Sequence, residues 1–258
     1  MKIGVVHPGS MGAALATALA GAHEVLWSSD GRSSATASRA RSASMTEVRD
    51  LGELAERSDI VVSICPPNAA IDVAKQVAQV RTSDLLYIDA NTIAPETVRR
   101  IADMFEPGAV VDAAVTGSPR LDLGATVLWL SGSRAVVAEE LFVGSPVSTR
   151  IVGAEIGQAS AFKMCAGLRS KVIPAVWATL IDAAKAFGPE VEESVRGHLA
   201  DIGHDLSEQE AKIAERAPKA WRWTGEMAES AKAMAEVDMP TGFSAAASET
   251  YRRIADPH

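Results

Sequence analysis

Cysteine is almost absent from this sequence, and aromatic residues are few. Only two of the 258 residues are cysteine, Cys65 and Cys165, and 5% are phenylalanine, tyrosine or tryptophan. Two cysteines in unrelated contexts exclude a disulfide framework and the paired spacing of a zinc site, and they fit a reducing compartment. We therefore expect a cytoplasmic protein with no metal site.

Long basic runs and long apolar runs are missing as well. The formal net charge is −8, and no basic cluster is long enough to follow a phosphate backbone, so nucleic acid is not an expected partner. The start of the chain has no apolar signal-peptide region, and no apolar run approaches the ~20 residues of a membrane-spanning helix. Hydrophobic residues still make up 47% of the chain. This composition predicts a packed core and no membrane partner.

The first half of the chain alternates short β-branched runs with alanine-rich stretches. This alternation predicts an α/β fold with a doubly wound parallel sheet, whose strands are covered on both faces by helices. The expected strands are Ile3–Val6, Glu24–Trp27, Ile60–Ile64, Leu85–Ile88, Ala109–Ala113 and Thr126–Ser131. The expected helices between them are Ala13–Ala20, Ala69–Val80 and Pro95–Met104. Ser33–Ser44 is interpreted as a low-complexity patch.

Beyond about residue 152 the β-branched runs thin out, and amphipathic alanine-rich stretches continue to the end. We therefore expect two domains, an α/β domain over 1–152 and an all-α domain over 153–258. Ile156–Phe187 is predicted to be one long helix that Pro174 kinks or interrupts. The further expected helices are Glu190–Gly203, Ser207–Ala217, Trp221–Val237 and Gly242–Ala255.

A glycine-containing turn follows the first expected strand. The segment Gly4–Gly12 reads G-V-V-H-P-G-S-M-G, so histidine replaces the first glycine of a dinucleotide-binding G-x-G-x-x-G motif. The second glycine of that motif lets the backbone approach a pyrophosphate, and the third lets the helix pack against the strand. The residues expected to contact a dinucleotide are His7, Pro8, Gly9, Ser10, Met11 and Gly12. The alternative is a turn between strand and helix that binds no ligand.

Residues at the end of the second strand decide between NAD(H) and NADP(H). An NAD-binding protein usually carries an acidic residue there, which binds the ribose 2′-hydroxyl. Ser28 stands at that position, with Ser29 and Arg32 close behind. Hydroxyls and a guanidinium suit a 2′-phosphate, so we expect NADP(H). Asp30 favours NAD(H) instead. The structural alternative is that these residues form a solvated loop rich in serine and arginine.

Four segments, taken in order, resemble the β-hydroxyacid dehydrogenase family, which includes 3-hydroxyisobutyrate and 6-phosphogluconate dehydrogenases. They are Gly9–Gly12, resembling the family's G-x-G-x-M-G; Asp89–Pro95, resembling D-x-S-T-x-x-P; Asp112–Ser118, resembling D-A-P-V-S-G-G; and Gly157–Lys163, resembling the stretch with the catalytic lysine. The resemblance covers roughly the first two thirds of the chain. It implies an N-terminal Rossmann domain, hydride transfer between nicotinamide and a small hydroxyacid or carbonyl substrate, and a homodimer formed through the helical domain.

The resemblance also implies roles for individual residues. Lys163 matches the family's general acid/base, which moves a proton at the substrate oxygen. The candidate substrate-binding residues are Thr116, Gly117, Ser118, Gly167 and Lys171. The alternatives are that either lysine lies on the surface and that residues 116–118 form a simple strand-to-loop turn.

Two further stretches are expected to line the dinucleotide. Asn91 would sit beside the nicotinamide, and the loop Cys65, Pro66 and Pro67 would border the bound cofactor. Cys65 has no charged neighbour in the sequence that would activate its thiol, so we interpret the side chain itself as packing.

The sequence also departs from the family. Ala166 and Gly167 stand where the family places an asparagine that helps to orient the substrate, and the helical domain is short, as in a compact phosphogluconate-dehydrogenase-like branch. Trp221, Trp223 and Tyr251 either line a substrate pocket or pack in a core or dimer interface. The leading hypothesis is an NADP(H)-dependent oxidoreductase. The alternatives are an imine reductase of the same fold and a non-catalytic NADP(H)-binding sensor or interaction module.

Overall fold

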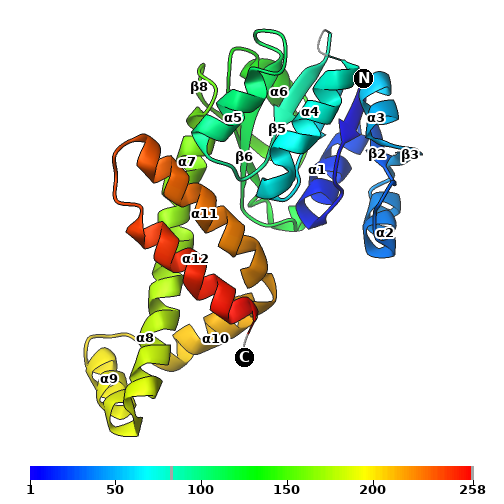
Figure 1. The fold of residues 1–258 in the computed structure, drawn as a ribbon. Helices are drawn as coiled ribbons and strands as arrows, with labels where there is room; N and C mark the ends of the chain where they lie inside the picture. Colours follow the sequence, from blue (N-terminus) through cyan, green and yellow to red (C-terminus); the bar gives the residue numbers. More distant parts are fainter. Residues whose placement is uncertain (82–83, 257–258) are drawn as a thin grey trace. The chain divides into compact units, whose positions relative to one another are not determined.

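The computed structural model describes residues 1–81 and 84–256, and these form two compact units, Met1–Lys163 and Met164–His258 (Figure 1). The first unit is an α/β unit and the second is helical. The expected division after residue 152 falls inside the last strand of the first unit, β8 (Ser148–Gly153). Lys163 therefore belongs to the same compact unit as the glycine-containing turn.

The first unit is built on one eight-stranded sheet in the order β3-β2-β1-β4-β5-β6-β7-β8. Its strands are β1 (Lys2–Val5), β2 (Glu24–Ser28), β3 (Thr46–Val48), β4 (Ile60–Ser63), β5 (Leu86–Asp89), β6 (Val110–Thr116), β7 (Val127–Ser131) and β8. The order reverses between β1 and β4, which makes the sheet doubly wound and confirms the predicted fold class. One correction is needed, because β6 and β7 pair antiparallel and the sheet is only mostly parallel.

Helices cover both faces of this sheet (Figure 1). They are α1 (Ser10–Ala20), α2 (Ser34–Ser42), α3 (Leu51–Arg57), α4 (Ala70–Val80), α5 (Pro95–Ala102) and α6 (Ala135–Glu140), with short 3₁₀ turns at Pro67–Ala69 and Leu121–Leu123. One buried apolar cluster joins the sheet to α1, α2 and α6, and a second joins it to α3, α4 and α5. Because both faces are buried, several strands are continuous apolar runs rather than alternating ones.

Several short elements were not predicted from the sequence. Within Ser33–Ser44, which we interpreted as low-complexity sequence, the structure has the helix α2, and the Ser33 hydroxyl accepts a hydrogen bond from the Thr36 amide at its start. Strand β3 has three residues, and β8 is mostly exposed at one edge of the sheet. These elements are too short or too polar to show a hydrophobic period, so tertiary contacts decide them.

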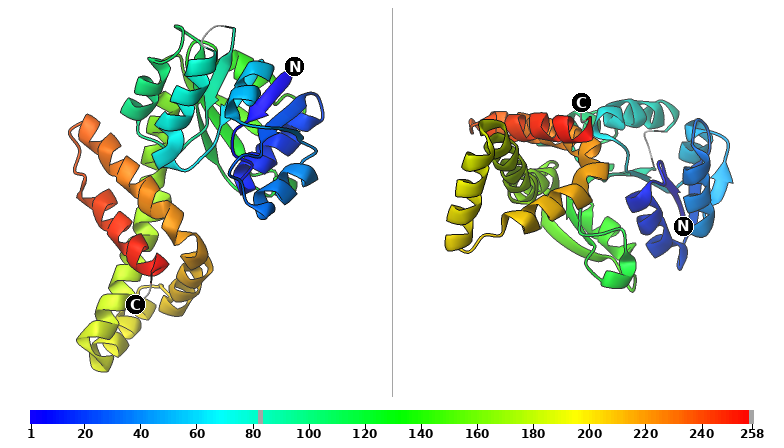
Figure 2. Two further views of the ribbon diagram at one scale, coloured as in Figure 1. Left: turned by 45° about the vertical axis from the view of Figure 1, so that its right-hand side comes forward. Right: turned by 90° about the horizontal axis from the view of Figure 1, so that it is seen from below.

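The second unit consists of helices. The chain enters it through α7 (Gln158–Gly167), whose last residues belong to this unit, and continues through a π-helical turn (Leu168–Val172), α8 (Ile173–Phe187), α9 (Pro189–Asp201), α10 (Leu206–Arg216), a 3₁₀ turn (Ala217–Lys219), α11 (Ala220–Glu236) and α12 (Gly242–Ala255). Helices α11 and α12 lie side by side (Figure 1; Figure 2, left). A buried hydroxyl pair, Ser230 and Ser244, joins them at 3.0 Å.

Pro174 is accompanied by a local change in the long helix that it was predicted to kink or interrupt. Residues 158–187 form one continuous 30-residue helix, and the π-helical turn lies directly before Ile173 and Pro174. Proline cannot donate a hydrogen bond to the preceding turn, and a wider turn at this place accommodates the missing bond. Among the described residues, this helix is the one that meets the length and hydropathy of a membrane span, which for a single helix is weak evidence.

A buried carboxylate joins the sheet to the start of α7. Asp112 of β6 is fully buried, and its Oδ2 accepts hydrogen bonds from the Ser131 hydroxyl (3.0 Å), the Gly157 amide (3.1 Å) and the Ser160 amide (2.9 Å). Its Oδ1 accepts a fourth from the Ser160 hydroxyl at 2.7 Å. Burial raises the pKa of Asp112, while these hydrogen bonds act in the opposite direction. The carboxylate therefore fixes where the first turn of α7 lies on the sheet.

A second buried carboxylate lies at the end of β5. Asp89 accepts hydrogen bonds from the backbone amide and the side-chain amide of Asn91, at 3.0 and 2.9 Å. Burial raises the pKa of Asp89 to about 7, against the effect of those two bonds, and nearby Asp112 adds to the rise. Asp89 therefore titrates near neutral pH in the folded protein.

Removing the Asp112 carboxylate should destabilise the first unit. We expect Asp112→Ala to lower the free energy of unfolding by roughly 2–4 kcal/mol, because four buried donors lose their acceptor. Asp112→Asn keeps one oxygen and should cost less than about 1 kcal/mol. Urea unfolding measures both variants, with Asp122→Ala as a control at an exposed carboxylate. Equal stability of the alanine and asparagine variants would contradict this account.

Asp89 should make stability depend on pH. Its pKa is about 7 in the folded protein and ~3.9 in an unfolded chain, so between these values the folded protein holds one more proton. The free energy of unfolding should therefore fall as pH rises from about 4 to 7, by at most ~1.4 kcal/mol per pH unit from this group. We expect Asp89→Asn to remove this contribution in urea unfolding between about pH 4 and 8, while Asp122→Asn keeps it. A slope unchanged in Asp89→Asn would overturn the assignment.

Candidate functional site

The turn between β1 and α1 has an open helix N-terminus. Gly9 is the N-cap of α1, and in the part of the chain that the structure describes no side chain caps the helix there. The Gly9 amide donates to the His7 carbonyl oxygen at 2.8 Å, which tightens the turn. Amides at an uncapped helix N-terminus, together with the helix dipole, favour an anion at this position.

Gly9 and Gly12 have different roles in the structure of this turn. A Cβ on Gly12 would lie 2.2 Å from the His7 carbonyl oxygen, so a side chain at this position would break the turn. A Cβ on Gly9 would meet only the His7 ring, at 3.4 Å or more, which is ordinary contact. The protein itself therefore requires Gly12, whereas Gly9 leaves an open backbone surface, as the second glycine of a dinucleotide-binding turn does.

Two arginines converge on the same turn. Arg32 Nη1 lies 2.8 Å from His7 Nδ1, and Arg39 Nε donates to the Pro8 carbonyl oxygen at 3.1 Å. Arg39 also donates to the Thr36 hydroxyl at 2.9 Å, so α2 fixes its direction. The Arg32 Nε hydrogen is buried and has no hydrogen-bond partner among the described residues, which is unusual for a guanidinium. Sequence reasoning missed Arg39, because the helix that carries it was not predicted.

The remaining residues of the predicted 2′-phosphate loop differ in exposure. Ser28 is buried at the end of β2, with 3% of its surface exposed, whereas Ser29 is half-buried. Asp30 is exposed. Ser10 and Met11 lie in the first turn of α1, exposed and half-buried respectively.

A hydrogen-bonded network ties the ends of β4 and β5 together. The Asn91 side chain accepts a hydrogen bond from the Cys65 amide at 2.6 Å and donates to Ser63 Oγ at 3.1 Å and to Asp89 at 2.9 Å. Both amide hydrogens of Asn91 are thus used inside the protein, so this side chain positions the two loops. Burial raises the pKa of the Cys65 thiol to about 12, which agrees with a packing role for that side chain. Pro66 is exposed, and Pro67 begins a 3₁₀ turn.

Lys163 lies directly beside the predicted substrate motif. Its ammonium donates to the Val115 carbonyl oxygen at 2.5 Å, one residue before Thr116. Lys163 is one helical turn beyond Ser160, which Asp112 holds, so the position of the amine follows from that buried carboxylate. The lysine and the motif belong to the same compact unit.

The motif at the end of β6 has a constrained shape. Gly117 has φ +97°, and a Cβ there would lie 2.0 Å from the Ala125 carbonyl oxygen, so only glycine fits. Thr116 Oγ1 accepts a hydrogen bond from Trp129 Nε1 at 2.9 Å and donates to Val127 O at 3.5 Å. Ser118 Oγ accepts from the Arg120 amide at 3.2 Å, which leaves its own hydrogen to donate.

An aromatic pair supports the lysine. Trp129 of β7 packs against Phe162, the neighbour of Lys163, with ring centroids 4.0 Å apart and the ring planes tilted by 31°. The Arg150 guanidinium lies 5.7 Å from the centroid of the Trp129 ring. Trp129 thus contacts both the predicted substrate motif and α7. Sequence reasoning missed this role, because a single tryptophan in a strand carries no motif.

Two predicted substrate residues lie in the helical unit. Lys171 forms an ion pair with Glu226 at 2.5 Å, with 14% and 12% of the two side chains exposed. Its carbonyl oxygen accepts a hydrogen bond from the Tyr251 hydroxyl at 2.6 Å. Gly167 is buried, and a Cβ there would meet only the Met227 side chain, at 3.6 Å. These contacts make Lys171 part of the internal structure of its unit.

The three aromatic residues of this unit that were predicted to line a pocket or to pack in a core or interface differ in burial. Trp223 and Tyr251 pack edge to face, 5.1 Å between centroids, in the apolar core of the helical unit. Trp221 is 61% exposed. Over residues 1–81 and 84–256, no group of three metal-ligating side chains occurs.

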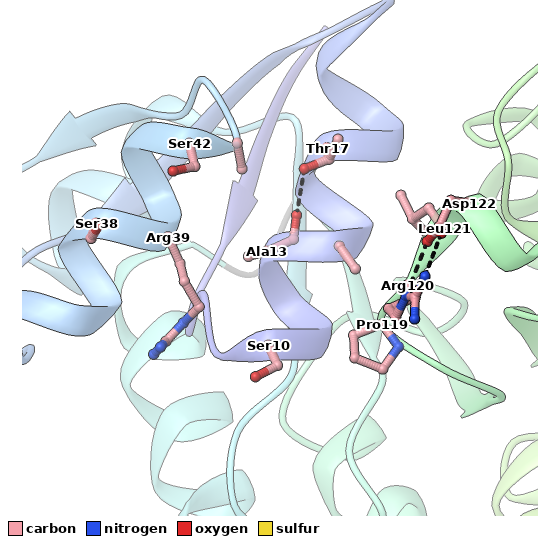
Figure 3. A pocket seen from close by; sticks show the side chains of 12 residues that line it. Ser10, Ala13, Thr17, Ser38, Arg39, Ser42, Pro119, Arg120, Leu121 and Asp122 are labelled. Atoms are coloured by element: carbon pink, nitrogen blue, oxygen red, sulfur yellow. Dashed lines mark hydrogen bonds and ion pairs between the residues drawn. The ribbon is translucent and has the colours of Figure 1, made fainter.

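A shallow pocket of about 430 Å³ lies beside the turn, between α1, α2 and the loop after β6 (Figure 3). Polar side chains contribute to its lining, including Ser10, Thr17, Arg39 and Arg120. Arg120 is paired with Asp122 at 2.8 Å, and the close-up shows Arg39 directed towards the end of α1 that carries Ser10 (Figure 3).

Comparisons with known proteins agree with this geometry. The NAD-binding domain of 6-phosphogluconate dehydrogenase matches residues 2–141, and a domain of unknown function, DUF1932, matches residues 184–254. An uncharacterised 28.5 kDa protein of Methanothermus fervidus is 26% identical over 188 residues, which cover 73% of this chain and 72% of that protein.

Solved structures extend the likeness to nearly the whole chain. A conserved protein of unknown function, described as structurally similar to 3-hydroxyacid dehydrogenases, is 28% identical with a TM-score of 0.70, covering 98% of this chain and 96% of that chain. The 3-hydroxyisobutyrate dehydrogenase of Mycobacterium tuberculosis has 18% identity and a TM-score of 0.72, covering 100% and 94%. An imine reductase of Myxococcus stipitatus shares the fold at 16% identity and a TM-score of 0.58, covering 98% and 93%.

The match to the NAD-binding domain spans more than half of the chain, and it contains the uncapped turn and the arginines described above. The chain therefore belongs to the family of 3-hydroxyisobutyrate and 6-phosphogluconate dehydrogenase-like proteins, with an NAD(P)-binding Rossmann domain and a helical C-terminal region.

Proposed function

We propose that the protein is an NADP(H)-dependent oxidoreductase that acts on a small hydroxyacid or carbonyl compound, with Lys163 as general acid/base. The observation that carries this proposal is the contact between the Lys163 ammonium and the Val115 carbonyl oxygen, immediately before Thr116–Ser118. It brings a proton donor to the end of β6 within the unit that also holds the dinucleotide-type turn. Parallel sheets of this kind bind ligands at the carboxyl ends of their strands.

The residues at the end of β6 have separate tasks. When the nicotinamide cofactor is bound, it supplies the hydride acceptor or donor. The Lys163 amine moves the proton at the substrate oxygen, and its hydrogen bond to Val115 holds it in one direction. The Ser118 hydroxyl and the backbone amides of Gly117 and Ser118 bind the substrate carboxylate or carbonyl, because the Thr116 hydroxyl already bonds to Val127 and Trp129.

The residues around the turn favour NADP(H) over NAD(H). Two guanidiniums approach it, and guanidinium groups suit a 2′-phosphate. Ser29 adds a half-buried hydroxyl to the same loop. Asp30, the one acidic residue of the loop, is exposed.

Assembly and location are part of the same proposal. We infer a homodimer formed through the helical unit, because large apolar side chains are exposed on it. These are Ile173, Val176, Phe187, Trp221 and Phe243, each at least half exposed. We infer a cytoplasmic location from the two free cysteines, which fit a reducing compartment.

Replacing Lys163 should separate chemistry from cofactor binding. In Lys163→Met we expect substrate-dependent change of the nicotinamide absorbance to fall by ~10²- to 10⁴-fold, while the Kd for NADPH stays within about threefold of the wild type. Lys75→Met, at an exposed lysine of α4, is the matched control. Full activity of Lys163→Met would refute the assigned role.

The substrate panel for this assay contains 2-keto, 3-keto, aldehyde and imine compounds with NADPH, and hydroxyacids with NADP⁺. Turnover of hydroxyacids or carbonyls supports the proposal. Turnover of imines alone would favour an imine reductase. Cofactor binding without any turnover would favour a non-catalytic module.

Cofactor preference is tested by calorimetry with both coenzymes. We expect NADPH to bind more tightly than NADH, and Arg32→Met to weaken NADPH by roughly ten- to a hundredfold, because a charge-assisted hydrogen bond is lost. The control is Arg41→Met, an exposed arginine of α2. Tighter binding of NADH by the wild type would refute the assignment.

A further inference from the structure

The imidazole of His7 stands where a dinucleotide-binding turn normally has its first glycine. No left-handed backbone conformation is needed there, because His7 is not among the described residues with positive φ. The side chain is therefore accommodated without backbone strain, and its two ring nitrogens face different surroundings.

The Nδ1 atom has a defined role. It lies 2.8 Å from Arg32 Nη1. A guanidinium only donates, so Nδ1 accepts this bond, and the hydrogen of a neutral ring must sit on Nε2. Burial lowers the pKa of His7, and the charges of Arg32 and Arg39 lower it further, which agrees with a neutral ring.

The opposite edge of the ring faces the turn. His7 Cδ2 and Nε2 lie 3.4 and 3.7 Å from the position that a Cβ on Gly9 would occupy. That position is the open surface of Gly9, through which the backbone approaches a pyrophosphate in this kind of turn. The Nε2 hydrogen thus lies beside the proposed phosphate site.

We propose that His7 is a cofactor-binding residue that donates its Nε2 hydrogen to the pyrophosphate and, through Nδ1, holds Arg32 in position for the 2′-phosphate. The proposal rests on the proposed function, since it assumes a dinucleotide across this turn. It gives His7 two effects. Loss of the donor weakens any dinucleotide, and loss of the acceptor weakens the one with a 2′-phosphate more.

Two substitutions of similar size separate these effects from simple packing. His7→Gln keeps a donor and an acceptor, whereas His7→Leu keeps the volume and removes both. In titration calorimetry we expect His7→Leu to weaken NADH by about tenfold and NADPH by more than that, in line with the loss of one and two hydrogen bonds. We expect His7→Gln to stay within about threefold of the wild type for both coenzymes.

A control and a fold check accompany these titrations. His198→Gln removes an exposed imidazole in α9 and should leave both Kd values unchanged. Thermal unfolding of each variant without cofactor reports whether the protein still folds. If His7→Leu does not fold, His7→Asn takes its place, because it keeps the acceptor and shortens the donor arm. His7→Asn should then bind both coenzymes more weakly than His7→Gln, and equal binding by these two variants would overturn the inference.

The outcomes distinguish two failures. If the wild type binds neither NADPH nor NADH, the proposed function itself fails. If the wild type binds and the folded His7→Leu variant binds NADH equally well, the inference about His7 alone is overturned. A loss in His7→Leu that His7→Gln restores supports it.

Discussion

The hydrogen bonds around the Asp112 carboxylate are the constraint on which the candidate site depends. One buried side chain of β6 accepts donors from β7 and from the first turn of α7, so three segments far apart in sequence are held at one place. Lys163 lies one turn further along α7 and meets the carbonyl of Val115, on the strand that carries Asp112. Asp112 thus sets the position of the proposed acid/base, because a buried carboxylate with four donors tolerates little movement.

A second constraint is the concentration of positive charge at one turn of an acidic chain. The net charge is −8, yet Arg32 and Arg39 both contact the segment His7–Pro8. Fields of this kind are local, since solvent screens charges more than about 10 Å away. A dinucleotide phosphate would therefore meet a positive turn in spite of the overall charge, and the uncapped start of α1 adds to the attraction.

The helical unit has an internal polar structure of its own. Lys171 and Glu226 are paired where little of either side chain is exposed, and such a pair is costly to break because each charge would remain buried alone. A substrate-binding role for Lys171 stays a prediction, and so does one for Gly167. Family membership fixes the architecture, whereas the proposed chemistry depends on Lys163 and the loop at the end of β6.

Local sequence determined the fold class, the longer helices and the glycine-containing turn, because hydrophobic period and glycine placement are properties of short segments. The resemblance in four ordered segments located Lys163 and Thr116–Ser118. Tertiary structure alone decided that Arg39 reaches Pro8, that Trp129 bonds to Thr116, that Asn91 uses its amide hydrogens within the protein, and that Lys171 pairs with Glu226. These contacts join residues that are distant in the chain or lie on elements too short to show a pattern, so they depend on packing, which no local window of sequence contains.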